Sequence, residues 1–132
     1  MIASNYREQY LKTKVETASP GDLTLLLYEE LYRKLNMAKM NFENQQFEEM
    51  LERIHGARAI LYELVGTLNF DYEISSQLRD LYVYYLSLLN EFAIKRNCEQ
   101  LEEVIEFSKE FSITWKTALN MTKSGQGLKN DK

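Results

Sequence analysis

The stretch SPGDLTLLLYEELYRKLNMAKMNF, Ser19 to Phe42, decides the fold because it joins a helix start to a long apolar stripe. Ser19 is a favoured N-cap residue, and Pro20 fits the first helical position, where its missing N–H would be unpaired anyway. Asp22, three residues after the cap, can reach back to the Ser19 amide. Apolar residues then recur at the three- and four-residue steps of one helical face: Leu27, Tyr28, Leu31, Leu35, Ala38 and Phe42. The stretch predicts a first long helix over 20–43.

The same spacing recurs three more times along the chain. The second stripe comprises Phe47, Leu51, Ile54, Ala57, Leu61, Leu64 and Leu68, and predicts a helix over 46–67. The third comprises Ile74, Leu78, Leu81, Tyr82, Tyr85, Leu88, Leu89 and Phe92, and predicts a helix over 73–96. The fourth comprises Leu101, Val104, Ile105, Ser108, Phe111, Trp115 and Leu119, and predicts a helix over 98–122. Because the connections are too short for crossovers, we expect an all-α, antiparallel up-and-down four-helix bundle.

Polar residues between the stripes suggest where the later helices begin. Asn44 and Asp71 are candidate N-caps for the second and third helices. Asn97 suits a left-handed C-terminal position or the next N-cap, and with Gln100 it forms a candidate capping box.

Two segments flank the predicted bundle of residues 19–122. Residues 1–18 carry Tyr6 and Tyr10 one helical turn apart, so part of this mobile N-terminal segment can form a short amphipathic helix, which needs a surface to dock on. Residues 123–132, with the sequence KSGQGLKNDK, are expected to be a flexible polar tail.

Composition narrows the class of protein. A net charge of −4 and no clustered basic run argue against nucleic acid as the main partner. Cys98 is the single cysteine and cannot form an internal disulfide, which favours a reducing compartment. The start MIASNYREQY has no basic region followed by an apolar run, and no apolar stretch approaches the ~20 residues that span a bilayer. We therefore expect a soluble, cytoplasmic protein without membrane insertion.

The sequence contains little that could perform catalysis. Glu52 and His55 form one Glu-x-x-His pair, but a di-iron bundle needs a second pair and two more glutamates, and His55 is the sole histidine. Cys98 lacks a nearby base in the sequence pattern. We therefore expect no enzyme activity, no metal and no cofactor, and interpret the chain as a binding protein.

Several apolar residues lie off the main stripes, so their helices are apolar over a wide arc: Ile60, Tyr62, Val83, Tyr84 and Leu86. That surplus fits either a broad core or an exposed groove for a partner helix, and the pattern alone leaves both open.

Four segments together resemble the FliS family of flagellin export chaperones. They are VETASPGDLTLLLY, AILYELVGTLN, LRDLYVYYL and LEEVIEFSKEFSITWK, and the resemblance runs from about Tyr10 to Leu119 and includes Trp115 near the end of the last helix. The resemblance implies a cytoplasmic chaperone that binds the C-terminal helical segment of flagellin. It would prevent premature polymerisation and keep flagellin competent for type III export, and other flagellar export or regulatory proteins are further possible partners.

The resemblance also implies a movable N-terminal cover, with Tyr10 at the position of the family's tyrosine. We expect the second and third helices to offer the apolar groove, and the hypothesised partner-binding residues are Tyr6, Tyr10, Ala57, Ile60, Leu61, Leu64, Leu81, Tyr84, Tyr85 and Leu88. The alternative is a structural helical bundle that homodimerises through its apolar face, and the expected state is a monomer or a weak homodimer.

Overall fold

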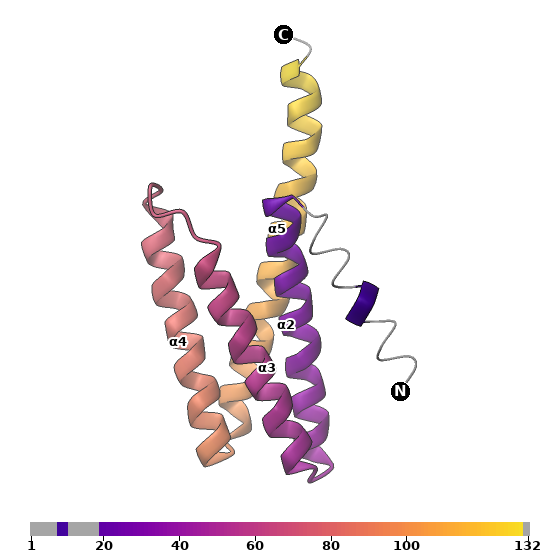
Figure 1. Cartoon of the computed structure of the whole chain (residues 1–132), viewed down its shortest axis with the longest axis vertical. Helices are drawn as coiled ribbons and strands as arrows, with labels where there is room; N and C mark the ends of the chain where they lie inside the picture. Colours follow the sequence, from indigo (N-terminus) through magenta and orange to yellow (C-terminus); the bar gives the residue numbers. More distant parts are fainter. Residues whose placement is uncertain (1–7, 11–18, 131–132) are drawn as a thin grey trace.

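Four long helices make up the bundle in the computed structural model, which describes residues 8–10 and 19–130, with side chains up to residue 122 (Figure 1). They are α2 (Pro20–Glu43), α3 (Phe47–Gly66), α4 (Ile74–Lys95) and α5 (Cys98–Asn130). Residues 8–10 form a separate helical turn. Within the described residues every regular element is a helix, which confirms the prediction of an all-α bundle.

Ser19 caps α2 as its sequence predicts, but the Asp22 carboxylate accepts from the Ser19 hydroxyl, where the prediction has the Ser19 amide. The Ser19 side chain accepts a hydrogen bond from the Asp22 backbone N–H at 3.2 Å, and the Ser19 hydroxyl donates to the Asp22 carboxylate at 2.9 Å. This pair satisfies one of the donors that a helix start leaves unpaired.

The later caps differ from their predictions. Asn44 ends α2 rather than starting α3, whose N-cap is Gln46, and Glu73 rather than Asp71 precedes α4. Neither of these N-caps makes a side-chain cap bond. The predicted capping box is wrong, because the Gln100 Oε1 atom, which would accept from the Asn97 N–H, has no partner in the described part of the chain, while the Gln100 Nε2 atom donates to Glu91.

The turn between α4 and α5 places a bulky residue in the left-handed region. Arg96 has φ 58°, while Asn97 supplies the cap by accepting from the Glu99 N–H at 3.1 Å. The Arg96 guanidinium lies 4.6 Å from the centroid of the Phe47 ring, an attractive cation–π contact that helps to hold the turn in this conformation.

The last helix is longer than expected. The apolar stripe predicts an end at 122, and α5 continues to Asn130, so that it extends beyond the other helices (Figure 1). No proline interrupts this segment, and glycines such as Gly125 lower helix propensity by only about 1 kcal/mol each without removing a backbone donor.

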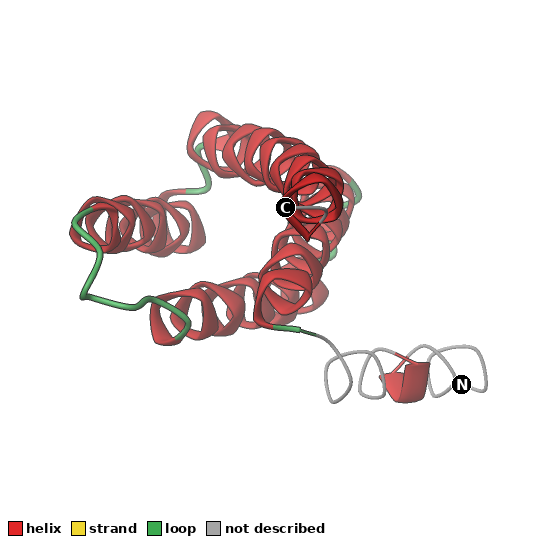
Figure 2. Ribbon diagram, turned by 90° about the horizontal axis from the view of Figure 1, so that it is seen from above, coloured by secondary structure: helices red, strands yellow, loops and turns green. Residues whose placement is uncertain are grey.

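The helices surround one core in the order α2, α3, α4, α5, with α5 closing back on α2 (Figure 2). The connections of residues 44–46, 67–73 and 96–97 are short, so consecutive helices run antiparallel. The core consists of Tyr28, Leu31, Leu35, Ala38, Met50, Ile54, Ala57, Ile60, Leu61, Leu64, Tyr82, Leu86, Leu88, Leu89, Phe92, Leu101, Val104 and Phe107.

A buried pair of phenols crosses this core between the diagonal helices α2 and α4. The hydroxyls of Tyr28 and Tyr82 are hydrogen-bonded to each other, and both side chains are only 2% exposed. Phe107 of α5 contacts both rings edge-on, so that aromatic side chains from three helices meet at one level of the bundle.

Candidate partner-binding surface

The hypothesised binding residues fall into three groups in the structure. Tyr6 lies outside the described residues, and Tyr10, in the turn of residues 8–10, is 57% exposed. Five residues are buried in the core: Ala57, Ile60, Leu61, Leu64 and Leu88. The remaining three, Leu81, Tyr84 and Tyr85, are half-buried or exposed on the side of α4 that faces α5.

A different set of apolar residues is exposed along the opposite side of α4, where it adjoins α3. On α3, Leu51, Arg58 and Tyr62 follow one another at steps of seven and four residues, and so share one face. On α4, Val83, Asn90 and Ile94 have the same spacing. We call the apolar members of these two rows, Leu51, Tyr62, Val83 and Ile94, the outer stripe; they are 41%, 64%, 53% and 81% exposed.

A hydrogen bond places the two rows next to each other. The Arg58 Nη1 atom donates to the Asn90 Oδ1 atom at 2.7 Å, and each residue is the middle member of its row. Because the helices run antiparallel, Leu51 lies toward the end of the bundle that holds Ile94, and Tyr62 toward the end that holds Val83. The outer stripe is therefore one surface formed by two helices.

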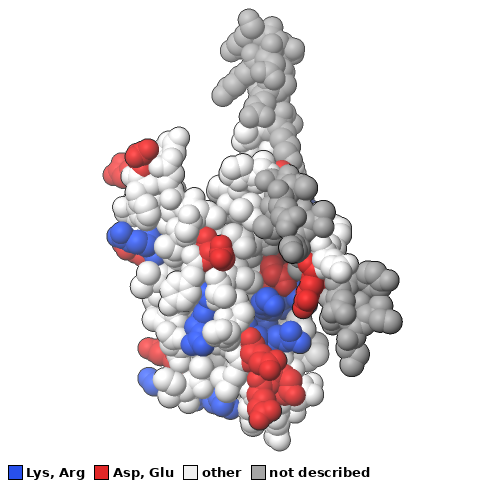
Figure 3. Space-filling view, in the orientation of Figure 1, with Lys and Arg blue, Asp and Glu red and all other residues white. Residues whose placement is uncertain are grey.

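Aromatic residues continue the outer stripe at both ends. Phe47 lies beneath Arg96 at one end, and the Arg79 guanidinium lies 5.6 Å from the centroid of the Phe70 ring at the other. Much of the face over α3 and α4 carries neither acidic nor basic side chains (Figure 3). The outer stripe thus carries apolar side chains on two rows, with the Arg58–Asn90 hydrogen bond in its middle and Arg96 and Arg79 near its ends.

The opposite side of α4 is more strongly tied to α5. Tyr85 stacks on Phe107 with ring centroids 4.0 Å apart, and the Tyr84 hydroxyl donates to the Glu103 carboxylate at 2.5 Å. Burial, followed by the charges of Glu103 and Glu110, raises the pKa of Tyr85. The Glu103 hydrogen bond is the main cause of a raised pKa at Tyr84. Both phenols are therefore neutral at ordinary pH.

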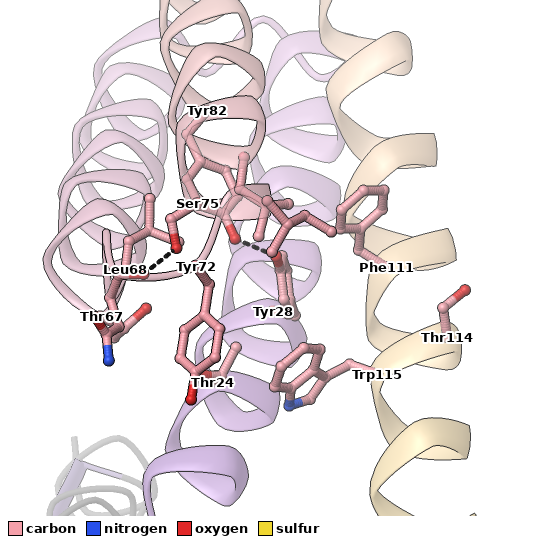
Figure 4. A pocket seen from close by; sticks show the side chains of 13 residues that line it. Thr24, Tyr28, Thr67, Leu68, Tyr72, Ser75, Tyr82, Phe111, Thr114 and Trp115 are labelled. Carbon is pink, nitrogen blue, oxygen red and sulfur yellow. Dashed lines mark hydrogen bonds between the residues drawn. The ribbon is translucent and has the colours of Figure 1, made fainter.

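An apolar cavity opens at the end of the bundle that holds the connection between α3 and α4 (Figure 4). We call it the end cavity; its volume is about 420 Å³. Its walls come from the first turns of α2, the α3–α4 connection, the first turns of α4 and the middle of α5. Tyr28, Tyr82 and Trp115 contribute the large aromatic surfaces.

Trp115 fastens one wall of the end cavity. Its indole Nε1–H donates to the Gly21 carbonyl at 2.8 Å, which ties α5 to the first turn of α2. The two helices are close here, because a Cβ atom added at Gly21 would lie 2.8 Å from Leu119 Cδ2.

Of the two residues considered for a metal site on α3, His55 shares the face of the outer stripe, because it lies four residues after Leu51 and seven before Tyr62. Glu52 and His55 are exposed on α3, and the described residues contain no group of three or more histidine, cysteine or acidic side chains arranged to hold a metal ion. Cys98 lies 3.8 Å from a Glu102 carboxylate oxygen, and burial together with that carboxylate raises the pKa of the thiol. A raised pKa disfavours the thiolate that a nucleophile requires. In the described part of the chain, no helix has the length and apolar character of a membrane span.

The sequence contains a signal for the outer stripe, but the predicted apolar stripe of α3 includes one of its residues wrongly. The predicted inward stripe includes Leu51, but Met50 is the fully buried residue there and Leu51 is exposed. Tyr62 and Val83 lie off the main stripes, and both are exposed. The recurrence of Leu51, Arg58 and Tyr62 at helical spacing could have identified a second face.

Comparison with known proteins gives consistent relatives. The family described as "Flagellar protein FliS" matches residues 2–122. A protein of Bacillus subtilis named "Flagellar secretion chaperone FliS" is 33% identical over 119 residues, which cover 90% of each chain. A protein of the same name from Campylobacter jejuni is 27% identical over 113 residues, covering 84% of this chain and 88% of the relative.

Proposed function

The chain belongs to the FliS family of flagellar proteins, and we propose that it is a non-enzymatic export chaperone that binds the C-terminal helical segment of flagellin. In this proposal it acts in the bacterial cytoplasm, prevents premature polymerisation of flagellin, and keeps it competent for type III export. The relatives' name, flagellar secretion chaperone, supports the general role.

The observation that carries the proposal is the outer stripe. Its four apolar side chains are between 41% and 81% exposed and lie on two adjoining helices, so an amphipathic helix can lay its apolar face between them. The distance from Leu51 to Tyr62 along α3 is on the order of 16 Å at ~1.5 Å per residue, which matches about three turns of a bound helix. A surface of this kind shields a partner helix without any covalent chemistry.

The energetics of such binding suit a chaperone that must release its client. A segment that is disordered when free and helical when bound loses conformational entropy on binding, on the order of 2 to 5 kcal/mol or more. This loss offsets part of the gain from burying apolar area. Affinity is therefore moderate for the size of the interface, and release for export remains accessible.

The other hypothesised residues have distinct places in this proposal. Leu81, Tyr84 and Tyr85 form a second, partly exposed strip beside α5 that a partner wrapping around α4 can reach. The buried residues Ala57, Ile60, Leu61, Leu64 and Leu88 support both surfaces from beneath.

A calorimetric titration with a peptide from the C-terminal end of the cognate flagellin tests the proposal. The wild-type chain should bind with a negative heat-capacity change, because apolar surface is buried. A double variant, Tyr62→Ser with Val83→Ser, removes two side chains of the outer stripe and should weaken binding about tenfold or more, which corresponds to about 1.4 kcal/mol.

Ile113→Ser is the matched control, because Ile113 is 56% exposed but lies on α5, away from the outer stripe. It should bind the peptide like the wild-type chain. Absence of binding by the wild-type chain would refute flagellin recognition. An equal loss in the control and the double variant would instead refute the assignment to the outer stripe.

For the N-terminal segment, with Tyr6 and Tyr10, we retain the proposal of a movable cover. Deleting residues 1–14 leaves the Ser19 cap in place, so the truncated chain should fold and should bind the flagellin peptide with a changed affinity. A truncated chain that does not fold would show that the segment belongs to the core.

Sedimentation of the free chain addresses the alternative function, a structural bundle that homodimerises through its apolar face. A tight dimer that does not bind flagellin would favour this alternative.

A further inference from the structure

The end cavity contains a hydrogen-bond donor that the protein itself does not use. Tyr28 and Tyr82 both line the cavity, and their hydroxyls point toward each other among its wall residues (Figure 4). Two phenols carry two O–H protons, and the bond between them uses one. Within the described part of the chain, no further hydrogen bond is made by either hydroxyl, so the second proton lacks a protein acceptor.

Four other polar side chains around the cavity donate to the backbone. The hydroxyls of Thr24, Thr67 and Ser75 donate to the carbonyls of Pro20, Leu64 and Asn69 respectively, and the Trp115 indole donates to that of Gly21. The remaining polar side chains, those of Asn69, Tyr72 and Thr114, belong to exposed residues. The spare phenol proton is therefore the one uncommitted donor among the buried wall residues that the structure describes.

The chemistry of the phenol pair restricts what can bind there. Burial is the main cause of a raised pKa at both Tyr28 and Tyr82, so both phenols stay protonated and the pair offers a neutral donor. A charged group would lose its hydration in an apolar cavity without gaining an opposite charge. A wholly apolar group would leave the donor unpaired, which is also unfavourable.

We propose that the end cavity is a binding site for a small uncharged ligand that is mainly apolar and carries one hydrogen-bond acceptor, which accepts the spare proton of the Tyr28–Tyr82 pair. The volume of about 420 Å³ lies within the range of ~300–1,000 Å³ typical of small-molecule sites. Apolar walls and one oriented polar group are also the usual composition of such sites. This site is separate from the outer stripe and does not depend on flagellin recognition.

Two probes of the same shape test the proposal directly. Acetophenone carries a carbonyl acceptor, and α-methylstyrene has a CH₂ group in place of that oxygen. Binding can be followed by NMR through the indole N–H signal of Trp115, the sole tryptophan, which lies in the cavity wall. The wild-type chain should bind acetophenone on the order of tenfold more tightly than α-methylstyrene.

Phenylalanine substitutions then identify the donor. In Tyr28→Phe or Tyr82→Phe one phenol remains, and its proton no longer has the other phenol as acceptor, so the preference for acetophenone should persist. In the double variant no donor remains, and the two probes should bind equally. This pattern distinguishes a ligand donor from a purely structural pair. If the pair were purely structural, each single substitution would already change the binding of the two probes as much as the double substitution does. Tyr62→Phe, on the outer stripe, is the control and should keep the wild-type preference.

Four results would overturn the proposal. One is that neither probe shifts the Trp115 signal of the wild-type chain, and another is that both bind it equally. The third is that the double variant keeps the preference for acetophenone. If the double variant does not fold, the wild-type comparison and the two single variants still decide, because loss of the preference in both singles, the fourth result, contradicts the spare-proton account.

Discussion

The inner and outer faces of α3 and α4 use the same kinds of residue for opposite purposes. Leu61 is fully buried, whereas its neighbour Tyr62 is 64% exposed, and Leu89 is buried six residues after the exposed Val83. On α2, by contrast, Met40 is the single large apolar residue that is strongly exposed among those described. The difference shows that α2, which lies between α3 and α5, turns most of its large apolar side chains toward the core. The helices α3 and α4 carry further large apolar side chains that the core does not bury.

The sharpest test of this comparison is a pair of adjacent truncations on α3. Leu61→Ala should lower the free energy of unfolding by about 2–5 kcal/mol, because it leaves a cavity in the core. Tyr62→Ala should change it by less than about 0.5 kcal/mol, because its side chain lies mostly in water. Urea denaturation measures both. Equal losses in the free energy of unfolding would mean that the Tyr62 side chain stabilises the fold. The outer stripe would then not be a free surface.

Sequence periodicity predicted the bundle well because each helix has one continuous apolar stripe, and the Ser19–Pro20–Asp22 start is specified locally. Periodicity could not separate buried from exposed residues on α3, where Met50 and Leu51 are adjacent and both apolar, but only Met50 faces the core. Which of two neighbouring apolar residues faces the core depends on the rotation of the helix against its partners. The end cavity was likewise beyond prediction, because its walls come from segments far apart in the chain.

Alkaline pH provides a test of the buried phenol pair. The pKa values of Tyr28 and Tyr82 are raised above the ordinary 10.0, mainly by burial, so the folded chain keeps protons that the unfolded chain releases. The stabilising contribution is therefore complete below pH 10 and falls as the pH rises above it, by up to about 1.4 kcal/mol per pH unit for each tyrosine. The Tyr28→Phe, Tyr82→Phe double variant should show a shallower decline between about pH 9 and about pH 11 in denaturation experiments. An unchanged slope would show that the pair is not buried in solution.

Ser19 tests whether exposure alone decides the effect of a substitution. The residue is exposed, yet Ser19→Ala should cost about 1 kcal/mol, since it removes the hydrogen bond that caps α2. Ser112→Ala is the control, because that hydroxyl only donates back to the Lys109 carbonyl within α5, and alanine is the better helix former. Thermal denaturation should show a loss for the first and no loss for the second. The reverse order would place the start of α2 elsewhere.

Alanine substitutions at Gly21, near the start of α2, and at Gly66, at the end of α3, have the smallest expected effects on stability. They compare a helix start that packs against α5 with a helix end that has open space around it. Neither has a positive φ, so alanine is allowed at both by the backbone. An added Cβ at Gly66 meets nothing within 4 Å, and Gly66→Ala should therefore stabilise the chain by up to about 1 kcal/mol through helix propensity.

At Gly21 the same Cβ would lie 2.8 Å from Leu119 Cδ2, so the Leu119 side chain must move. Because that atom is the far end of a flexible side chain, we expect the two effects nearly to cancel, with Gly21→Ala changing stability by less than about 0.5 kcal/mol. The double variant Gly21→Ala, Leu119→Ala separates the contact from propensity in a thermodynamic cycle. A gain at Gly21 as large as that at Gly66 would show that α5 is not held against the start of α2, and the Trp115 bond to Gly21 would then be too weak to close the wall of the end cavity.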